Sequence, residues 1–215
     1  MNWHNFVECQ NWGMNTLTVS AIGTVFFTFW QLYAAVAQSK KIWSGKPVES
    51  VSLQLFAYNF YYFVATLIYG IYQHKLAIIF NGLLFIPSLP IVIGILKFQK
   101  NEPWEKYFSF LGLLMIPAMI IFPQKNLVIE VVLSGLIVFI IIQVRDIMKN
   151  KKFGALSIEF IVIYLVVNVF WFIYGYNVGN YPYMFFCSLA IGLYSFGVYL
   201  FFRYKKINST SEKKK

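Results

Sequence analysis

The sequence predicts an all-α integral membrane protein with seven transmembrane helices. Of its 215 residues, 59% are hydrophobic and only 12% are charged, a balance untypical of a soluble domain. Charged residues are nearly absent from windows of about 20 residues, the length that a helix needs to cross the hydrocarbon core. A transmembrane barrel would instead show alternating segments of about ten residues. The windows lie near residues 17–38, 52–73, 76–96, 107–122, 127–148, 155–177 and 182–202.

The chain also resembles itself when it is shifted by 105 residues. The shift aligns Gln38 with Gln143, and the Tyr-Gly pair at 69–70 with the pair at 174–175. A duplicated unit of three helices accounts for this match. For the second copy to start on the same side of the membrane as the first, one extra crossing must intervene. We therefore expect two parallel three-helix bundles joined by an inversion linker helix, in a 3+1+3 order.

The basic residues predict the orientation. If the N-terminus is outside, 16 of the 18 Lys and Arg residues fall on the inner side, which predicts an N-out, C-in protein of the cell membrane. The same placement explains the net charge of +10 without a nucleic-acid partner. The expected segments are an extracytoplasmic interfacial N-terminus (1–16), the first repeat (17–100), the linker helix (101–126), the second repeat (127–205) and a basic cytoplasmic tail (206–215).

Local signals mark the ends and the bends of these helices. Trp3, Phe6 and Trp12 favour a short interfacial helix before the first span, with its aromatic rings at headgroup level. The second and sixth spans open with Ser52 and Ser157, whose hydroxyls can cap a helix start. Prolines at 87, 90 and 117 predict kinks in the third and fourth spans, which are candidate hinges.

The repeat resembles the PQ-loop superfamily, which includes the SWEET and SemiSWEET sugar transporters. The resemblance rests on a Gln followed by Ser after 13 intervening residues, a Lys eight residues after the Gln, and an aromatic run ending in Tyr-Gly. It covers about residues 30–100 and 135–205. Trp171 matches the pocket Trp of the W-x-x-Y-G pattern, Asn81 falls close to an Asn of the third span, and Asn59 matches an Asn of the PQ-loop pattern.

The sequence departs from that family in two respects. Ala37 and Ile142 stand where the family has the Pro of Pro-Gln. The pocket pair is also split, because repeat 1 has Thr66 in place of Trp, while repeat 2 has Cys187 or Ser188 in place of Asn. The resemblance implies that Gln38 and Gln143 lie near an inner gate.

Polar residues inside the membrane are costly and are functional candidates by default. Asn side chains donate and accept hydrogen bonds, and Trp offers a flat face, which together suit a neutral polar ligand. For each Asn the alternative is a hydrogen bond between helices, and for Trp171 it is packing. Glu130 is either a proton-coupling group or an interface residue that reaches water. The expected solute site consists of Asn81, Trp171, Asn59, Thr66, Asn168 and Ser188.

The expected function is transport of a small neutral or zwitterionic solute, such as a sugar or an amino acid, by alternating access and facilitated diffusion. Two alternatives stay open: a sorting or sensing receptor resembling the KDEL receptors, and a carrier of a vitamin precursor or nucleoside resembling the nicotinamide riboside transporters. His4 and His74 form no metal or catalytic motif, so we expect neither an enzyme nor a cofactor or metal. The expected partners are a solute and the lipid bilayer, and a homo-oligomer is an open possibility.

Overall fold

The computed structural model describes residues 5–44, 53–98, 103–150 and 158–212. Ser52, Ser157 and Trp3 lie outside these residues, so the expectations for them are not tested. The chain divides into two units, Met1–Val132 (unit 1) and Leu133–Lys215 (unit 2).

The described residues are largely helical, as the sequence predicts, and five stretches are long and apolar enough to cross a membrane. Two further apolar helical stretches, Ser109–Ile121 and Ile161–Asn177, are shorter. They coincide with the fourth and sixth predicted spans. The five long stretches are Thr16–Lys40, Leu53–Gln73, Leu76–Phe98, Lys125–Ile142 and Tyr181–Tyr204.

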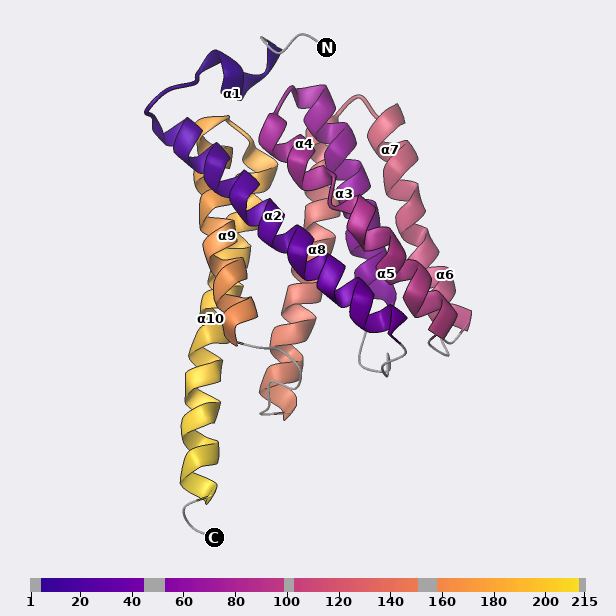
Figure 1. Cartoon of the computed structure of the whole chain (residues 1–215), viewed down its shortest axis with the longest axis vertical. Coiled ribbons are helices and arrows are strands. Elements are labelled where there is room, and N and C mark those ends of the chain that lie inside the picture. The colour runs from indigo at the N-terminus through magenta and orange to yellow at the C-terminus, as the bar shows by residue number, and fades with distance from the viewer. Residues whose placement is uncertain (1–4, 45–52, 99–102, 151–157, 213–215) are drawn as a thin grey trace. The chain divides into compact units, whose positions relative to one another are not determined.

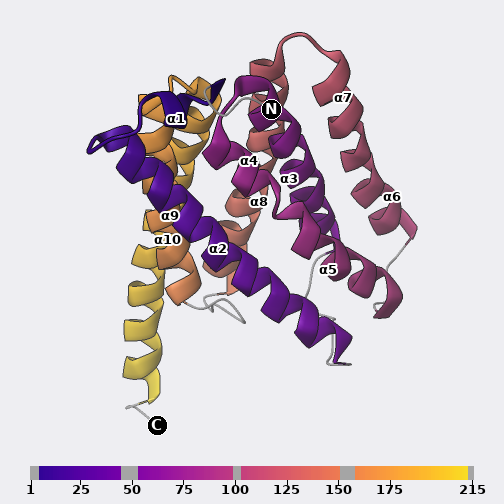
Figure 2. The same cartoon turned by 45° about the horizontal axis from the view of Figure 1, so that its top comes forward.

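Unit 1 is built around one helix, α3 (Leu53–Gln73), which packs against several others. Figure 1 and Figure 2 show α6 and α7 running alongside it. The other elements of unit 1 are α1 (Val7–Gln10), α2 (Thr16–Trp43), α4 (Leu76–Gly82), α5 (Phe85–Phe98), α6 (Pro103–Leu111), the 3-10 turn η2 (Gly112–Leu114), α7 (Met115–Ile121) and the first part of α8 (Lys125–Asn150).

A row of small hydroxyl side chains lies on the buried face of α2. Ser20, Thr24 and Thr28 are buried, and each donates a hydrogen bond to a carbonyl three or four residues earlier in the same helix. An unpaired hydroxyl is costly away from water, so these internal bonds make a polar row compatible with a transmembrane helix. The helix begins at a cap, since the Asn15 side chain accepts a hydrogen bond from the Thr18 amide at 2.8 Å.

Two of the three prolines expected to bend helices stand four residues after an interruption. Pro87 has no N–H for the carbonyl of Leu83, and α4 and α5 are separated at that point. Pro117 has the same relation to Leu113, which lies in η2 between α6 and α7. Pro90 lies within α5 and does not interrupt it. The third and fourth predicted spans are therefore broken helices.

The C-terminal end of α2 is fixed to α5. The Trp43 indole Nε1 donates a hydrogen bond to the Pro90 carbonyl at 3.0 Å, and the Lys97 ammonium lies 5.3 Å from the centre of the same ring. Ile42 is buried in a cluster with Ile91 and other apolar residues. These contacts join the first and third predicted spans at one end.

Unit 2 consists of the rest of α8, α9 (Ile158–Asn177) and α10 (Tyr181–Glu212). α9 and α10 form a hairpin and lie side by side in both ribbon views (Figure 1 and Figure 2). Ile137 and Ile140 of α8 pack with Ile161, Ala190 and Tyr194 of this hairpin. α10 stays helical to Glu212 and so includes most of the expected tail 206–215, because its last part contains no Gly or Pro that would end it.

The turn between α3 and α4 in unit 1 and the turn between α9 and α10 in unit 2 share a left-handed residue and a backbone hydrogen bond. They contain the residues of positive φ, His74 at 53° and Gly179 at 60°, which are 105 positions apart. The amide of the following residue donates back to the glycine of the Tyr-Gly pair, at 3.0 Å in unit 1 and 2.7 Å in unit 2. The shift by 105 residues found in the sequence therefore holds without a gap through this turn.

Candidate functional site

In unit 1, Asn81 of α4 and Tyr62 of α3 form a buried hydrogen bond. The Asn81 Nδ2 donates to the Tyr62 hydroxyl at 3.2 Å, and the two residues are 4% and 7% exposed. Asn81 was expected at the site, whereas Tyr62 was not. A signal for Tyr62 did exist in the sequence, because Asn59, Tyr62 and Thr66 follow the i, i+3, i+7 spacing of one helix face.

Two glycines allow α4 to approach α3 closely enough for this bond. A Cβ atom on Gly82 would lie 2.5 Å from the backbone N and Cα of Leu67, and one on Gly70 would lie 2.8 Å from the backbone N of Ile79. Any larger residue at either position would push the helices apart, so the glycines fix their separation. Gly82 directly follows Asn81 and thereby sets the position of its side chain.

Thr66 and Asn59 complete the polar residues expected on α3. Thr66 is fully buried, and its Oγ1 has no hydrogen-bond partner among the described residues. Asn59 is half-buried. An unpaired buried hydroxyl costs about 1–3 kcal/mol, so Thr66 offers a group that a bound polar molecule could satisfy.

In unit 2, Trp171 of α9 lies among aromatic rings. Its ring centroid is 5.2 Å from that of Tyr183 on α10 and 5.6 Å from that of Tyr174 on its own helix. All three residues are at most 5% exposed. The family pattern located Trp171, but it did not predict that Tyr183 packs against it.

The other polar residues expected in unit 2 bond to their own helices. The Asn168 Nδ2 donates to the Tyr164 carbonyl at 2.7 Å, and the Ser188 Oγ donates to the Met184 carbonyl at 2.8 Å. Asn168 is buried, whereas Ser188 is exposed. Asn180, which the sequence reading missed, is 2% exposed, and its Nδ2 has no partner within the described part of the chain.

The residues expected to gate or to couple transport lie on the long helices. Gln38 is half-buried on α2. Gln143 is on α8, but its side chain lies outside the described part of the structure. Glu130 is half-buried in the part of α8 that belongs to unit 1.

The two units therefore offer different chemistry. Unit 1 offers an amide and two hydroxyls, which donate and accept hydrogen bonds without net charge, and unit 2 offers flat aromatic faces. Among the described residues, no group of three or more His, Cys, Asp or Glu side chains is arranged to hold a metal ion.

The fold is similar to that of a protein of known structure. The chain matches the structure of a eukaryotic SWEET transporter with a TM-score of 0.72, over 89% of this chain and 97% of that chain, at 13% sequence identity. No family model and no curated protein matches the chain. At this identity the likeness concerns the fold, and on that level the resemblance inferred from the repeat is confirmed: the chain has the fold of a SWEET transporter.

Proposed function

We propose that this protein is a membrane transporter that moves a small neutral or zwitterionic polar solute, such as a sugar or an amino acid, by alternating access. The observation that carries the proposal is the likeness to a SWEET transporter over nearly the whole of both chains. The proposal includes seven membrane-spanning helices in a 3+1+3 order, with the N-terminus outside. The charge distribution of the sequence supports that orientation.

We assign solute binding first to Asn81 and Trp171. Asn81 presents an amide on a short helix, and only one of its two N–H bonds is needed for Tyr62. Thr66 adds a buried hydroxyl that a solute hydroxyl or amine could satisfy. In unit 2 the Trp171 ring provides an apolar face of the kind that covers the C–H side of a sugar or an amino acid side chain. Asn59, Asn168 and Ser188 complete the proposed set.

The break after α4 supports a moving site. Asn81 is the last residue but one of α4, and the interruption caused by Pro87 follows directly. Broken helices near a binding site let the backbone bend there while the rest of the helix stays rigid. We assign Gln38 and Gln143 to the inner gate. We also propose facilitated diffusion, in which Glu130 is not required for coupling to protons.

The proposal is tested by counterflow in proteoliposomes. Radiolabelled glucose, sucrose, alanine and a nucleoside are offered to the purified protein, and the variants Asn81→Ala and Trp171→Ala are compared with it. Two matched controls are available: Asn177→Ala, at a half-buried position where the amide bonds the Ile173 carbonyl of its own helix, and Trp30→Ala, whose side chain is 51% exposed.

We expect one solute class to exchange. Both site variants should lose about tenfold or more of the rate, as removing a hydrogen-bonding or stacking group from a polar site does, and both controls should retain it. Exchange that survives in both site variants would refute the assigned site. If none of the solutes exchanges while a soluble peptide ligand raises the melting temperature, the receptor alternative replaces transport.

A further inference from the structure

The N-terminal segment Phe6–Gln10, here called the clasp, is bound to the α3–α4 turn. Phe6 is only 1% exposed, and its ring meets the His74 ring edge-on, with centroids 6.2 Å apart. The Val7 amide donates to the His74 carbonyl at 3.2 Å. Phe6 is thus buried in the protein, whereas Trp12 is 69% exposed. The clasp joins the chain ahead of α2 to the start of α4.

Glu8 makes the central contact of the clasp. Its Oε2 accepts a hydrogen bond from the Leu76 amide at 3.1 Å, and its Oε1 accepts one from the Ala77 amide at 3.0 Å. The carboxylate is buried, at 5% exposure. Leu76 and Ala77 are the first residues of α4, whose amides have no carbonyl partner within the helix. A carboxylate at this position also interacts favourably with the helix dipole.

Unit 2 has a side-chain cap at the position where unit 1 has none. The corresponding helix start in unit 2 is capped from within, because the Asn180 Oδ1 accepts a hydrogen bond from the Tyr183 amide at 3.3 Å. The residue 105 positions earlier is Lys75, whose side chain has no acceptor atom and makes no cap bond. Glu8 therefore replaces, from a distant part of the sequence, the cap that repeat 1 does not have.

Lys75 and Glu8 also depend on each other electrostatically. Lys75 is 6% exposed, and burial lowers the pKa of its ammonium group, while the Glu8 carboxylate acts in the opposite direction and raises that pKa. A buried charge is tolerated when an opposite charge lies nearby. Loss of either partner removes this favourable interaction from the other one, which stays buried.

We infer that Glu8 is a positioning residue: it caps α4 from the clasp and thereby holds Asn81 in place. α4 has only seven residues and ends at an interruption, so it is too short to be stable by itself. The clasp fixes its first turn, and the close contact of Gly82 with Leu67 of α3 fixes its last. The importance for solute binding rests on the proposed function, whereas the capping does not.

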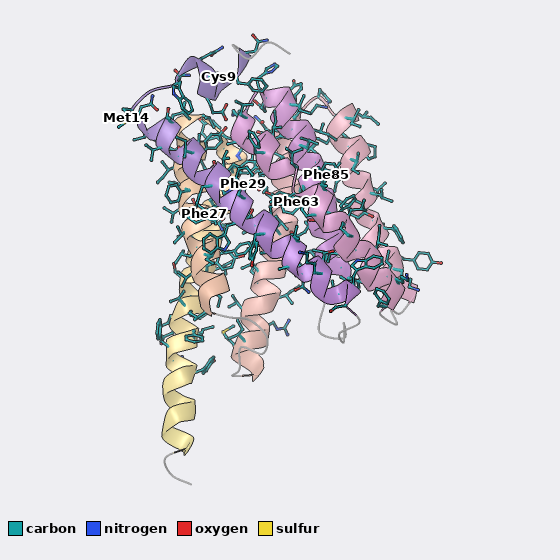
Figure 3. The ribbon with its side chains drawn as sticks, in the orientation of Figure 1. Cys9, Met14, Phe27, Phe29, Phe63 and Phe85 are labelled. Atoms are coloured by element: carbon teal, nitrogen blue, oxygen red, sulfur yellow. The ribbon has the colours of Figure 1, made fainter. Side chains whose placement is uncertain are left out.

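Hydrogen–deuterium exchange of the full-length protein in detergent tests the capping without any solute. Glu8→Ala should speed exchange at Leu76 and Ala77 by about fivefold or more, because losing a helix cap makes local opening easier. Cys9→Ala is the matched control, since Cys9 neighbours Glu8 on α1 and is exposed (Figure 3). The start of α10 serves as an internal control and should not change. Unchanged exchange at Leu76 and Ala77 would overturn the inference.

A second substitution separates capping from a general loss of stability. Lys75→Asn gives repeat 1 the cap residue of repeat 2, so in the Glu8→Ala background it should return exchange in α4 to within about twofold of the wild type. In the wild-type background Glu8 already accepts hydrogen bonds from the Leu76 and Ala77 amides, so the same substitution should change exchange there by less than about twofold. If Lys75→Asn has the same effect in both backgrounds, Glu8 does not act as the cap.

The transport assay then tests the positioning of Asn81. For the solute that exchanges, Glu8→Ala should raise the KM several-fold more than it lowers the maximal rate, and Lys75→Asn should restore the KM. A faster-exchanging α4 with an unchanged KM would overturn the positioning role. If the wild type moves no solute, the proposed function fails, and the exchange data still decide whether Glu8 caps α4 and holds the segment of Asn81.

Discussion

Replacing Gly82 with alanine tests whether α4 rests directly on the backbone of α3. The added Cβ would lie 2.5 Å from the N and Cα of Leu67, and these backbone atoms cannot rotate away. An ordinary contact between carbon atoms needs about 3.5 Å, so α4 must move outward by about 1 Å. Asn81 moves with it, and its 3.2 Å bond to Tyr62 then exceeds hydrogen-bonding distance.

The expected cost follows from these two effects. Overpacking costs about 1–3 kcal/mol, and the lost hydrogen bond adds about 0.5–1.5 kcal/mol. In a chain of this size each kcal/mol lowers the melting temperature by about 2–4 °C, so Gly82→Ala should melt about 3 to 18 °C lower. The measurement is thermal unfolding in detergent, followed by tryptophan fluorescence.

Gly192→Ala on α10 is the matched control, because nothing lies within 4 Å of a Cβ at that position. Alanine is favoured over glycine in a helix by about 1 kcal/mol, so this variant should melt at the wild-type temperature or above it. If Gly82→Ala and Gly192→Ala have the same melting temperature, α4 does not pack closely on α3, and the reason given for the position of Asn81 is wrong.

Three further predictions concern single residues. Gly70→Ala should lower the melting temperature more than Gly175→Ala, although both glycines belong to a Tyr-Gly pair, because a Cβ on Gly70 meets backbone at 2.8 Å and one on Gly175 meets a flexible methionine side chain at 3.3 Å. Trp43→Phe should keep the ring contacts but lose the bond to the Pro90 carbonyl, at a cost of about 0.5–1.5 kcal/mol in chemical unfolding. Burial lowers the pKa of Lys75 in the folded state, so the unfolded chain binds more protons as the pH approaches 10.5, and stability should rise with pH there. Lys75→Met should remove this contribution to the pH dependence of the melting temperature, measured from pH 8 upward.

Much of the fold could be predicted because it depends on local composition. Charge-free windows identified the helices, and the Tyr-Gly pairs aligned the two repeats at a turn that has an equivalent backbone hydrogen bond in both units. Pro87 and Pro117 located the interruptions, since a missing N–H acts on a carbonyl only four residues away. Pro90 shows the limit of that rule, because α5 continues through it.

The site was harder to predict because its contacts join residues far apart in sequence. Glu8 lies 68 residues before Leu76, and no local pattern relates a carboxylate near the N-terminus to a helix start in the third predicted span. The bond between Asn81 and Tyr62 depends on the close approach of α3 and α4, which is a property of packing. Composition identified Asn168 as a costly polar residue, but it does not reveal that this amide bonds a carbonyl of its own helix.

The turn shared by the two units has a consequence for tracing the ancestry of such proteins. His74 and Gly179 occupy the same left-handed position, and the residues after them, Lys75 and Asn180, donate the same backbone hydrogen bond, yet these side chains have nothing in common. What the two copies retain is a left-handed residue and a backbone hydrogen bond, and what has diverged is the side chain that caps the following helix. Backbone features of this kind therefore align the two repeats at positions where the side chains have diverged. It also follows that residues 71–75 could be exchanged for 176–180, giving a first repeat whose α4 carries a cap residue of its own.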